Sequence, residues 1–341
     1  MIRWGITASA GEQKKKQAVI AFGVDQTPYV LAYSWSDSSG FGAKYANPSS
    51  LVGAQVFGLN FSPNGLYIGG SVLAAAQVFV YPWNNGFGTR YANPTASSGS
   101  CNAMCWSPST NAVVAGFSLT PFVSGFPWSV SGFGTKYAAP SALPAGSVRS
   151  PTFNPSGNTV ALAHNTTPFV TVYAWSSGFG TKYANPATLP PSNSAGAAFS
   201  PNGSTLAIAS VSSPYANAYP WSGSGFGTKY ANPATLPGAS GNSVTFNPSG
   251  NTVAFASGNT PYVAVYPWSG SGFGTKYANP ATLPSGSGNA LKFSPSGASL
   301  AISSSGANYF FVYPWNNGFG TKFADPTVLS TFTSRDVTFS P

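Results

Sequence analysis

Charged side chains are scarce in this chain of 341 residues: only 6% are Asp, Glu, Lys or Arg, against roughly 25% in an ordinary soluble domain. The five acidic residues, Glu12, Asp25, Asp37, Asp325 and Asp336, form no close pair in the sequence. Paired carboxylates, a nucleophile with its base and a phosphate-binding loop before a helix are all missing. This inventory predicts that the protein is not an enzyme and has no catalytic residues.

Histidine and cysteine are as scarce, which limits metal and disulfide chemistry. Cys101 and Cys105 are four residues apart on or beside an expected strand, where an extended chain sets them too far apart to bridge. They are expected to be free thiols. The one histidine, His164, is interpreted as a loop residue after a strand. Because a complete ligand set is missing, neither a metal nor a cofactor is expected.

Long hydrophobic runs are also absent. No stretch approaches the ~20 apolar residues that cross a bilayer, and residues 1–16 lack the apolar core and cleavage pattern of a signal peptide. The sequence therefore predicts a soluble protein that is made in the cytoplasm and is not inserted into a membrane.

Glycine, proline and aromatic residues are abundant instead, and they are arranged in a repeat. Gly-Phe-Gly, followed two residues on by a cation and an aromatic residue, occurs seven times with successive starts 46 or 47 residues apart. Such a period is typical of architectures with four short strands per unit. The copies begin at Gly40, Gly86, Gly132, Gly178, Gly225, Gly272 and Gly318.

The unit that begins at Ser243 shows how each repeat is expected to fold. Apolar residues alternate with polar ones in two runs that are separated by Pro-Ser-Gly-Asn, which predicts two strands joined by a tight turn. The run 262–268 is almost continuously apolar, as in a strand buried on both faces, and a short fourth strand is expected at 275–277. No helical period is present, so the chain is predicted to be all-β.

Each third strand ends in a tryptophan that is expected to be structural, because seven such faces can be buried only against neighbouring units. Seven blades are therefore predicted. The seven tryptophans are Trp35, Trp83, Trp128, Trp175, Trp221, Trp268 and Trp315.

The two ends of the chain explain how the ring would close. Residues 336–341 copy the first strand of a unit and then stop, while the first unit lacks that strand. We expect blade 1 to combine 336–341 with 17–49, in preference to pairing with residues 2–6, because only the C-terminal segment copies the first strand of the other blades. Such closure removes open sheet edges, which invite aggregation. The prediction is one domain, 1–341: a seven-bladed β-propeller with four antiparallel strands per blade, in which blades 2 to 7 follow at the 46-residue period.

The first strands and their turns resemble the WD40 type of β-propeller repeat, as in Phe-Ser-Pro-Asn-Gly at Phe61 and Phe199. The Gly-His and the Asp after the closing Trp that this family uses are missing here. The segment from Gly-Phe-Gly to Asn-Pro is similar to repeats in structural proteins of tailed bacteriophages. That resemblance implies a non-enzymatic virion component, placed in a tail or capsid, with other virion proteins or a host-surface receptor as partners.

A lectin-like propeller that holds a glycan between its blades is the alternative. Such a protein should repeat its polar binding groups in every blade, whereas a docking scaffold needs irregularities on one side. Irregular residues gather at the N-terminus and in the third blade, at Cys101, Cys105 and Phe126, which favours docking.

One cation per unit would form a ring and is the candidate binding set. A polyanion site is one interpretation, although nucleic acid is disfavoured as a partner; protection of outer strands against edge pairing is the preferred one. Lys14, Lys15 and Lys16 form a second cluster that could contact an acidic neighbour. The ring comprises Lys44, Arg90, Lys136, Lys182, Lys229, Lys276 and Lys322.

Overall fold

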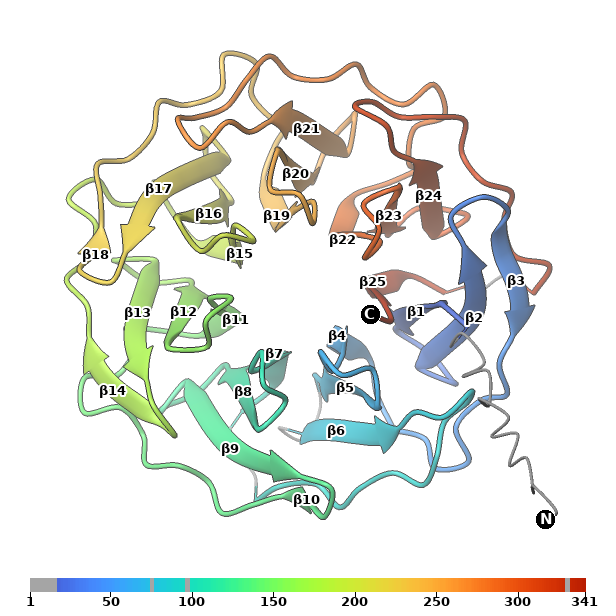
Figure 1. Cartoon of the computed structure of the whole chain (residues 1–341), viewed down its shortest axis with the longest axis horizontal. Helices are drawn as coiled ribbons and strands as arrows, with labels where there is room; N and C mark the ends of the chain where they lie inside the picture. Colours follow the sequence, from blue (N-terminus) through green and yellow to red (C-terminus); the bar gives the residue numbers. More distant parts are fainter. Residues whose placement is uncertain (1–16, 74–76, 96–98, 329–331) are drawn as a thin grey trace, which may run out of the picture.

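Seven small antiparallel sheets stand around a central channel in the computed structural model, and together they form a disc (Figure 1). The structure describes residues 17–73, 77–95, 99–328 and 332–341. The all-β, seven-bladed β-propeller that the sequence predicts is thereby confirmed. None of the described segments forms a helix that could span a lipid bilayer.

Each blade has its first strand at the channel and its later strands farther out (Figure 1). The channel-facing strands are β25 (Ser334–Phe339), β4 (Val56–Phe61), β7 (Cys101–Trp106), β11 (Val148–Phe153), β15 (Ser194–Phe199), β19 (Gly241–Phe246) and β22 (Gly288–Phe293). The second strands are β1 (Val19–Val24), β5 (Tyr67–Val72), β8 (Ala112–Phe117), β12 (Thr159–His164), β16 (Thr205–Ser210), β20 (Thr252–Ser257) and β23 (Ser299–Ser304). The third strands are β2 (Val30–Ser36), β6 (Gln77–Pro82), β9 (Val123–Ser129), β13 (Val170–Trp175), β17 (Ala216–Ser222), β21 (Val263–Pro267) and β24 (Phe310–Pro314).

The outermost strands begin earlier in the repeat than expected and vary in length from two to five residues. The Gly-Phe-Gly motif itself supplies them, rather than the segment at 275–277, because the motif's Phe pairs with the Trp that ends the third strand. Four blades have such a strand and the other three have a single bridge in its place. The four strands are β3 (Gly40–Lys44), β10 (Gly132–Phe133), β14 (Phe179–Lys182) and β18 (Gly225–Phe226).

The ring closes through the C-terminal strand, as predicted. β25 pairs with β1 in an antiparallel register that places Phe339 opposite Ile20 and Val337 opposite Phe22. The Ser340 side chain adds a bond by accepting from the Val19 amide at 3.0 Å. Residues 2–6, the alternative partner for this position, lie outside the described residues.

The closing tryptophans are almost completely buried, at 2–7% exposure, and each is enclosed edge-to-face by three aromatic rings, or by four at Trp128. For Trp268 these rings are Phe246 and Phe273 of its own blade and Tyr230 of the preceding blade, at centroid distances of 5.8, 5.1 and 5.2 Å. All seven cages have this arrangement, with distances of 4.8–5.8 Å. Each cage therefore joins two blades.

Asp37 links the first blade to the last one through side-chain hydrogen bonds. Asp37 accepts bonds from the Trp35 indole (3.0 Å) and, across the seam, from the hydroxyls of Ser296 (2.5 Å) and Ser299 (2.6 Å). Burial raises the pKa of Asp37, but these hydrogen bonds outweigh it and hold the pKa below its usual value. The carboxylate thus stays ionised where the ring closes.

We expect Trp268→Ala to lower the free energy of unfolding by about 3 to 5 kcal/mol, because it empties one cage and loosens two blades. Leu66→Ala, at a side chain that is 50% exposed, is the control and should cost less than about 0.5 kcal/mol. Denaturant unfolding measures both. A loss under about 1 kcal/mol for Trp268→Ala would mean that the cages do not hold the blades together.

Candidate functional site

The central channel is a cavity with a volume of about 950 Å³ among the described residues. Its wall is made by the seven channel-facing strands, so it collects residues that are as much as 280 positions apart in the chain, from Phe57 to Val337. Four charged side chains line it: Arg149, Lys292, Arg335 and Asp336.

A comparison of equivalent positions in the seven channel-facing strands shows how these four residues differ from the repeat. At the second position of the channel-facing strand, three blades carry an asparagine whose side-chain amide donates to a backbone carbonyl of the next blade at 2.7–2.8 Å. Asparagine at this position therefore fastens one blade to the next. Arg149 and Arg335 replace that asparagine in β11 and β25, and both line the channel.

Asp336 stands at the third position of the same strand, where the other blades have glycine, alanine or serine. Its two carboxylate oxygens accept bonds from the backbone amides of Leu59 (2.6 Å) and Val337 (2.8 Å). Burial raises the pKa of Asp336 to about 6, against the opposing influence of these bonds and of Lys292. The result is an oriented carboxyl group that titrates close to neutral pH.

Lys292 comes from β22, in the blade next to Asp336. Its side chain is exposed to the channel, and the surrounding walls lower its pKa while the Asp336 carboxylate opposes that shift. Three cations and one carboxylate among the described lining residues leave the channel with a net positive charge. Anions are the ligands that such a focused field attracts.

One wall of the channel is made of small residues. β15 presents Ala195 and Ala198 where the other blades carry larger or polar side chains, and both line the cavity together with Gly196. Gly196 packs so closely on the next blade that an added Cβ would lie 2.9 Å from the Ser243 Cα atom. β15 lies across the channel from the charged strand β25 (Figure 1).

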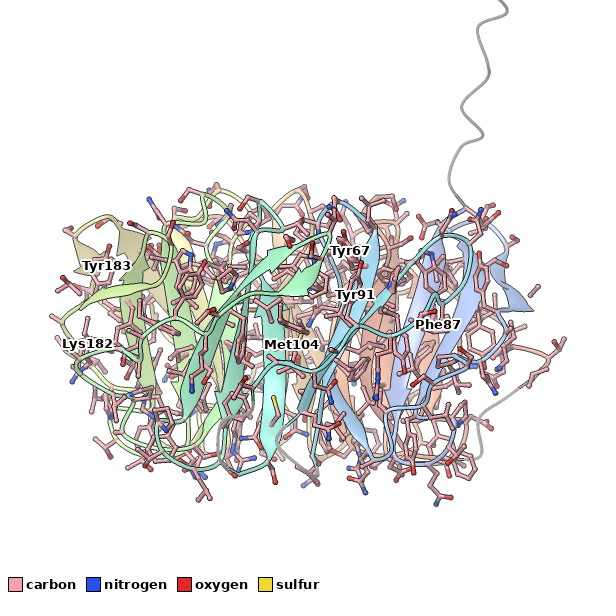
Figure 2. All side chains as sticks on the ribbon, turned by 90° about the horizontal axis from the view of Figure 1, so that it is seen from below. Tyr67, Phe87, Tyr91, Met104, Lys182 and Tyr183 are labelled. Atoms are coloured by element: carbon pink, nitrogen blue, oxygen red, sulfur yellow. The ribbon has the colours of Figure 1, made fainter. Side chains whose placement is uncertain are left out.

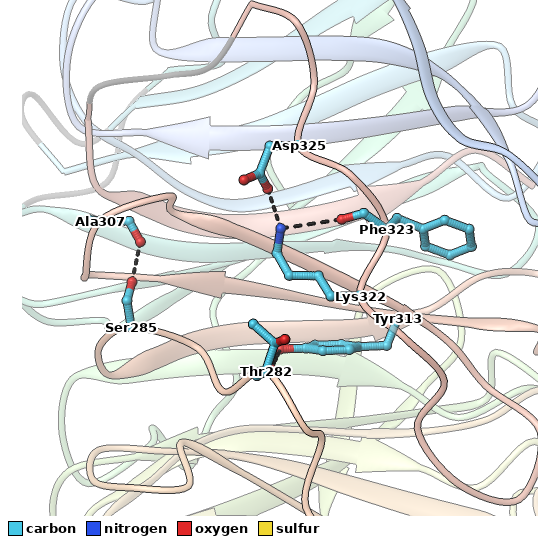
Figure 3. A network of polar contacts seen from close by, with 7 residues as sticks. All are labelled: Thr282, Ser285, Ala307, Tyr313, Lys322, Phe323 and Asp325. Atoms are coloured by element: carbon cyan, nitrogen blue, oxygen red, sulfur yellow. Dashed lines mark hydrogen bonds and ion pairs between the residues drawn. The ribbon is translucent and has the colours of Figure 1, made fainter.

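The cation ring that the sequence singled out lies away from the channel, around the rim of the disc, as Lys182 shows in the edge-on view (Figure 2). Several of its lysines hold the side chain three residues later, as Lys44 does with Asn47 and Lys322 with Asp325 (Figure 3). The linker that follows Lys276 is held as well, because the Tyr313 hydroxyl donates to the Thr282 carbonyl at 2.6 Å. These contacts give most of the ring a part in positioning linkers. Lys14, Lys15 and Lys16 lie outside the described residues.

His164 is not the loop residue that the sequence suggested. It ends strand β12, is fully buried, and its Nε2 atom lies 2.9 Å from the Thr171 hydroxyl. Burial lowers the pKa of His164 to about 4.

Cys101 and Cys105 are both free, and burial raises the pKa of each thiol.

No protein-family model matches the sequence, and no curated protein does. Solved structures do resemble it. Propellers from Bacteroides uniformis and Bacteroides fragilis, both provisionally named 6-phosphogluconolactonases, are 13% and 11% identical, with TM-scores of 0.68 and 0.71. A protein from Lactobacillus plantarum is 12% identical, with a TM-score of 0.72. The matches cover 95–96% of this chain and 99–100% of those chains.

The prediction of a non-enzymatic virion protein is wrong on this comparison. The similar solved structures include two that are named as enzymes, and none of the three is named as a virion protein. The physical reason lies in what the repeats encode: the Gly-Phe-Gly segment forms outer strands and aromatic cages, so it specifies a propeller and no function. The prediction also tested only acids that are close in sequence, whereas the channel gathers its charges from three separate blades.

For the cation ring we expect that replacing Lys136, Lys182, Lys229 and Lys276 with Gln leaves the salt dependence of heparin binding unchanged but promotes self-association. The matched control replaces the same four residues with Arg, which keeps the charge. Light scattering and binding at several salt concentrations measure both effects. A fall in the slope of about 0.9 per lost contact would instead identify the ring as a polyanion site.

Proposed function

We propose that the protein hydrolyses a small anionic ester of the lactone type and that the central channel is its active site. The observation that carries this proposal is the Asp336 carboxyl group, which lies in a cationic channel, is oriented by two backbone amides, and has a pKa raised to about 6. General bases work best when their pKa lies near the working pH.

Lactone hydrolysis needs a base and a stabilised oxyanion. Water adds to the carbonyl carbon while its proton passes to a base, and the ring C–O bond then breaks to leave a carboxylic acid and a hydroxyl group. Asp336 would take the proton from water and return it to the ring oxygen as the C–O bond breaks. Lys292, whose charge is close enough to influence the pKa of Asp336, would stabilise the negative charge on the carbonyl oxygen.

The other cations of the channel favour a substrate that is itself an anion. Arg149 stands on β11, across the ring from β22 and β25, so the positive charge is distributed over opposite walls (Figure 1). The names of the two Bacteroides propellers make 6-phosphogluconolactone the first substrate to test.

We expect kcat/KM for this lactone to rise as the pH increases through about 6, because the base must be ionised to accept a proton. Asp336→Asn should lower kcat/KM by about 100-fold or more and abolish the pH dependence. Asp325→Asn, which removes an acid at the rim, is the matched control. Rates from pH 5 to 7, corrected for spontaneous hydrolysis, provide the measurement.

An Asp336→Asn variant that is folded and keeps the parental rate would contradict the proposal, as would a parental protein that hydrolyses no lactone. Circular dichroism and thermal unfolding of each variant exclude loss of folding as the cause of a lost rate.

A further inference from the structure

Among the described residues, Arg335 is the channel cation that contacts both a carboxylate and an aromatic ring. Its Nη2 atom lies 3.6 Å from the Asp25 Oδ2 atom, and its guanidinium carbon lies 5.7 Å from the ring centre of Phe57. Arg335 and Phe57 both line the channel, whereas Asp25 lies outside the lining, just after strand β1. The guanidinium is thus held between a carboxylate at its back and an aromatic face.

The contact between Asp25 and Arg335 leaves one polar atom of each side chain without a hydrogen-bond partner in the part of the chain that the structure describes. The Asp25 Oδ1 atom and the Arg335 Nε atom are both buried, and neither has a hydrogen-bond partner among the described residues. In a bidentate arginine–carboxylate pair, the Arg335 Nε–H would donate to the Asp25 Oδ1 atom. A pairing of these two atoms would leave the Nη1 group of Arg335 for a ligand.

Asp25 is itself held by the backbone. Its amide donates to the Thr333 carbonyl at 3.2 Å, next to the start of β25. The closure of the ring therefore brings Asp25 behind Arg335, although the two residues are 310 positions apart in the chain. Phe57 comes from the neighbouring blade through β4.

From this geometry we propose that Arg335 is the residue that anchors the oxyanion group of the ligand, and that Asp25 and Phe57 are positioning residues that hold its guanidinium in place. The proposal rests on the proposed function for the site but deepens it, because it assigns the recognition of the anion to one arginine. Planar arginine forks bind phosphate and carboxylate groups through paired N–H donors, which a lysine cannot do.

Two effects of Asp25 on anion binding oppose each other. Its negative charge weakens the attraction of the channel for an anion, whereas its contact with Arg335 fixes the donor geometry. Lys292 and Arg149 keep the channel positive in either case. We expect the fixed geometry to decide, because an unrestrained arginine must lose its side-chain freedom when the ligand binds.

Calorimetric titration of the full chain tests this with 6-phosphogluconate, gluconate and inorganic phosphate. We expect Arg335→Gln to raise Kd by at least about tenfold and Asp25→Asn by about threefold to tenfold, with Arg335→Lys failing to restore binding. Arg90→Gln and Asp325→Asn, which remove the same charges at the rim, should leave Kd unchanged. Binding of 6-phosphogluconate and phosphate without gluconate identifies a phosphate anchor, and equal binding of gluconate identifies a carboxylate anchor.

The proposal is overturned if the parent binds none of these anions, if Arg335→Gln binds as the parent does, or if Asp25→Asn binds more tightly. Should Asp25→Asn fail to fold, Phe57→Leu replaces it, because it removes the aromatic face and keeps an apolar side chain; an unchanged Kd there overturns the positioning role. Arg335-dependent binding without lactone hydrolysis supports this proposal and contradicts the proposed function, so the two are tested separately.

Discussion

The edge-to-face packing of a tryptophan between two blades is the contact on which the rest of this structure depends. Each cage takes a tyrosine or phenylalanine from the preceding blade, so no blade can complete its own core. Seven such contacts fix the spacing of the blades, and Trp35 extends the series across the closure, where it meets Phe323 of the last blade and Phe339 of the C-terminal strand.

The tryptophan cages, which hold neighbouring blades together, therefore lie away from the channel. The residues of the channel-facing strands whose side chains face the lumen carry less of the packing, so they can differ from blade to blade without cost to the cages. Asn242 and Asn289 join neighbouring blades through hydrogen bonds, whereas Arg335, at the same strand position, lines the channel. The charges that a ligand would meet are therefore found where the repeat is least regular.

The sequence was sufficient for the fold because the features that repeat are the ones that pack. The closing tryptophans, the Pro-Ser-Gly turns and the unmatched first strand at 336–341 all predicted a closed ring. The outer strand was misplaced, because apolar spacing does not reveal that Phe273 pairs with Trp268. His164 was misplaced for a related reason: a single polar residue at the end of a strand resembles a loop residue.

The site was harder to predict, since Arg149, Lys292, Arg335 and Asp336 meet only when three blades are arranged around one axis. The cations that recur, such as Lys44 and Lys322, attracted attention because they recur, yet their contacts hold linkers. A usable signal was present: an alignment of the seven first strands shows a charge only where the consensus has asparagine, threonine or a small residue.

A crystal structure of the protein with 6-phosphogluconate tests most directly whether the channel charges form one binding site. We expect the ligand inside the channel, within hydrogen-bonding distance of at least two of Arg149, Lys292 and Arg335, with its carboxyl carbon near Asp336. A ligand bound only at the rim beside Lys136 or Lys229, with an empty channel, would contradict it.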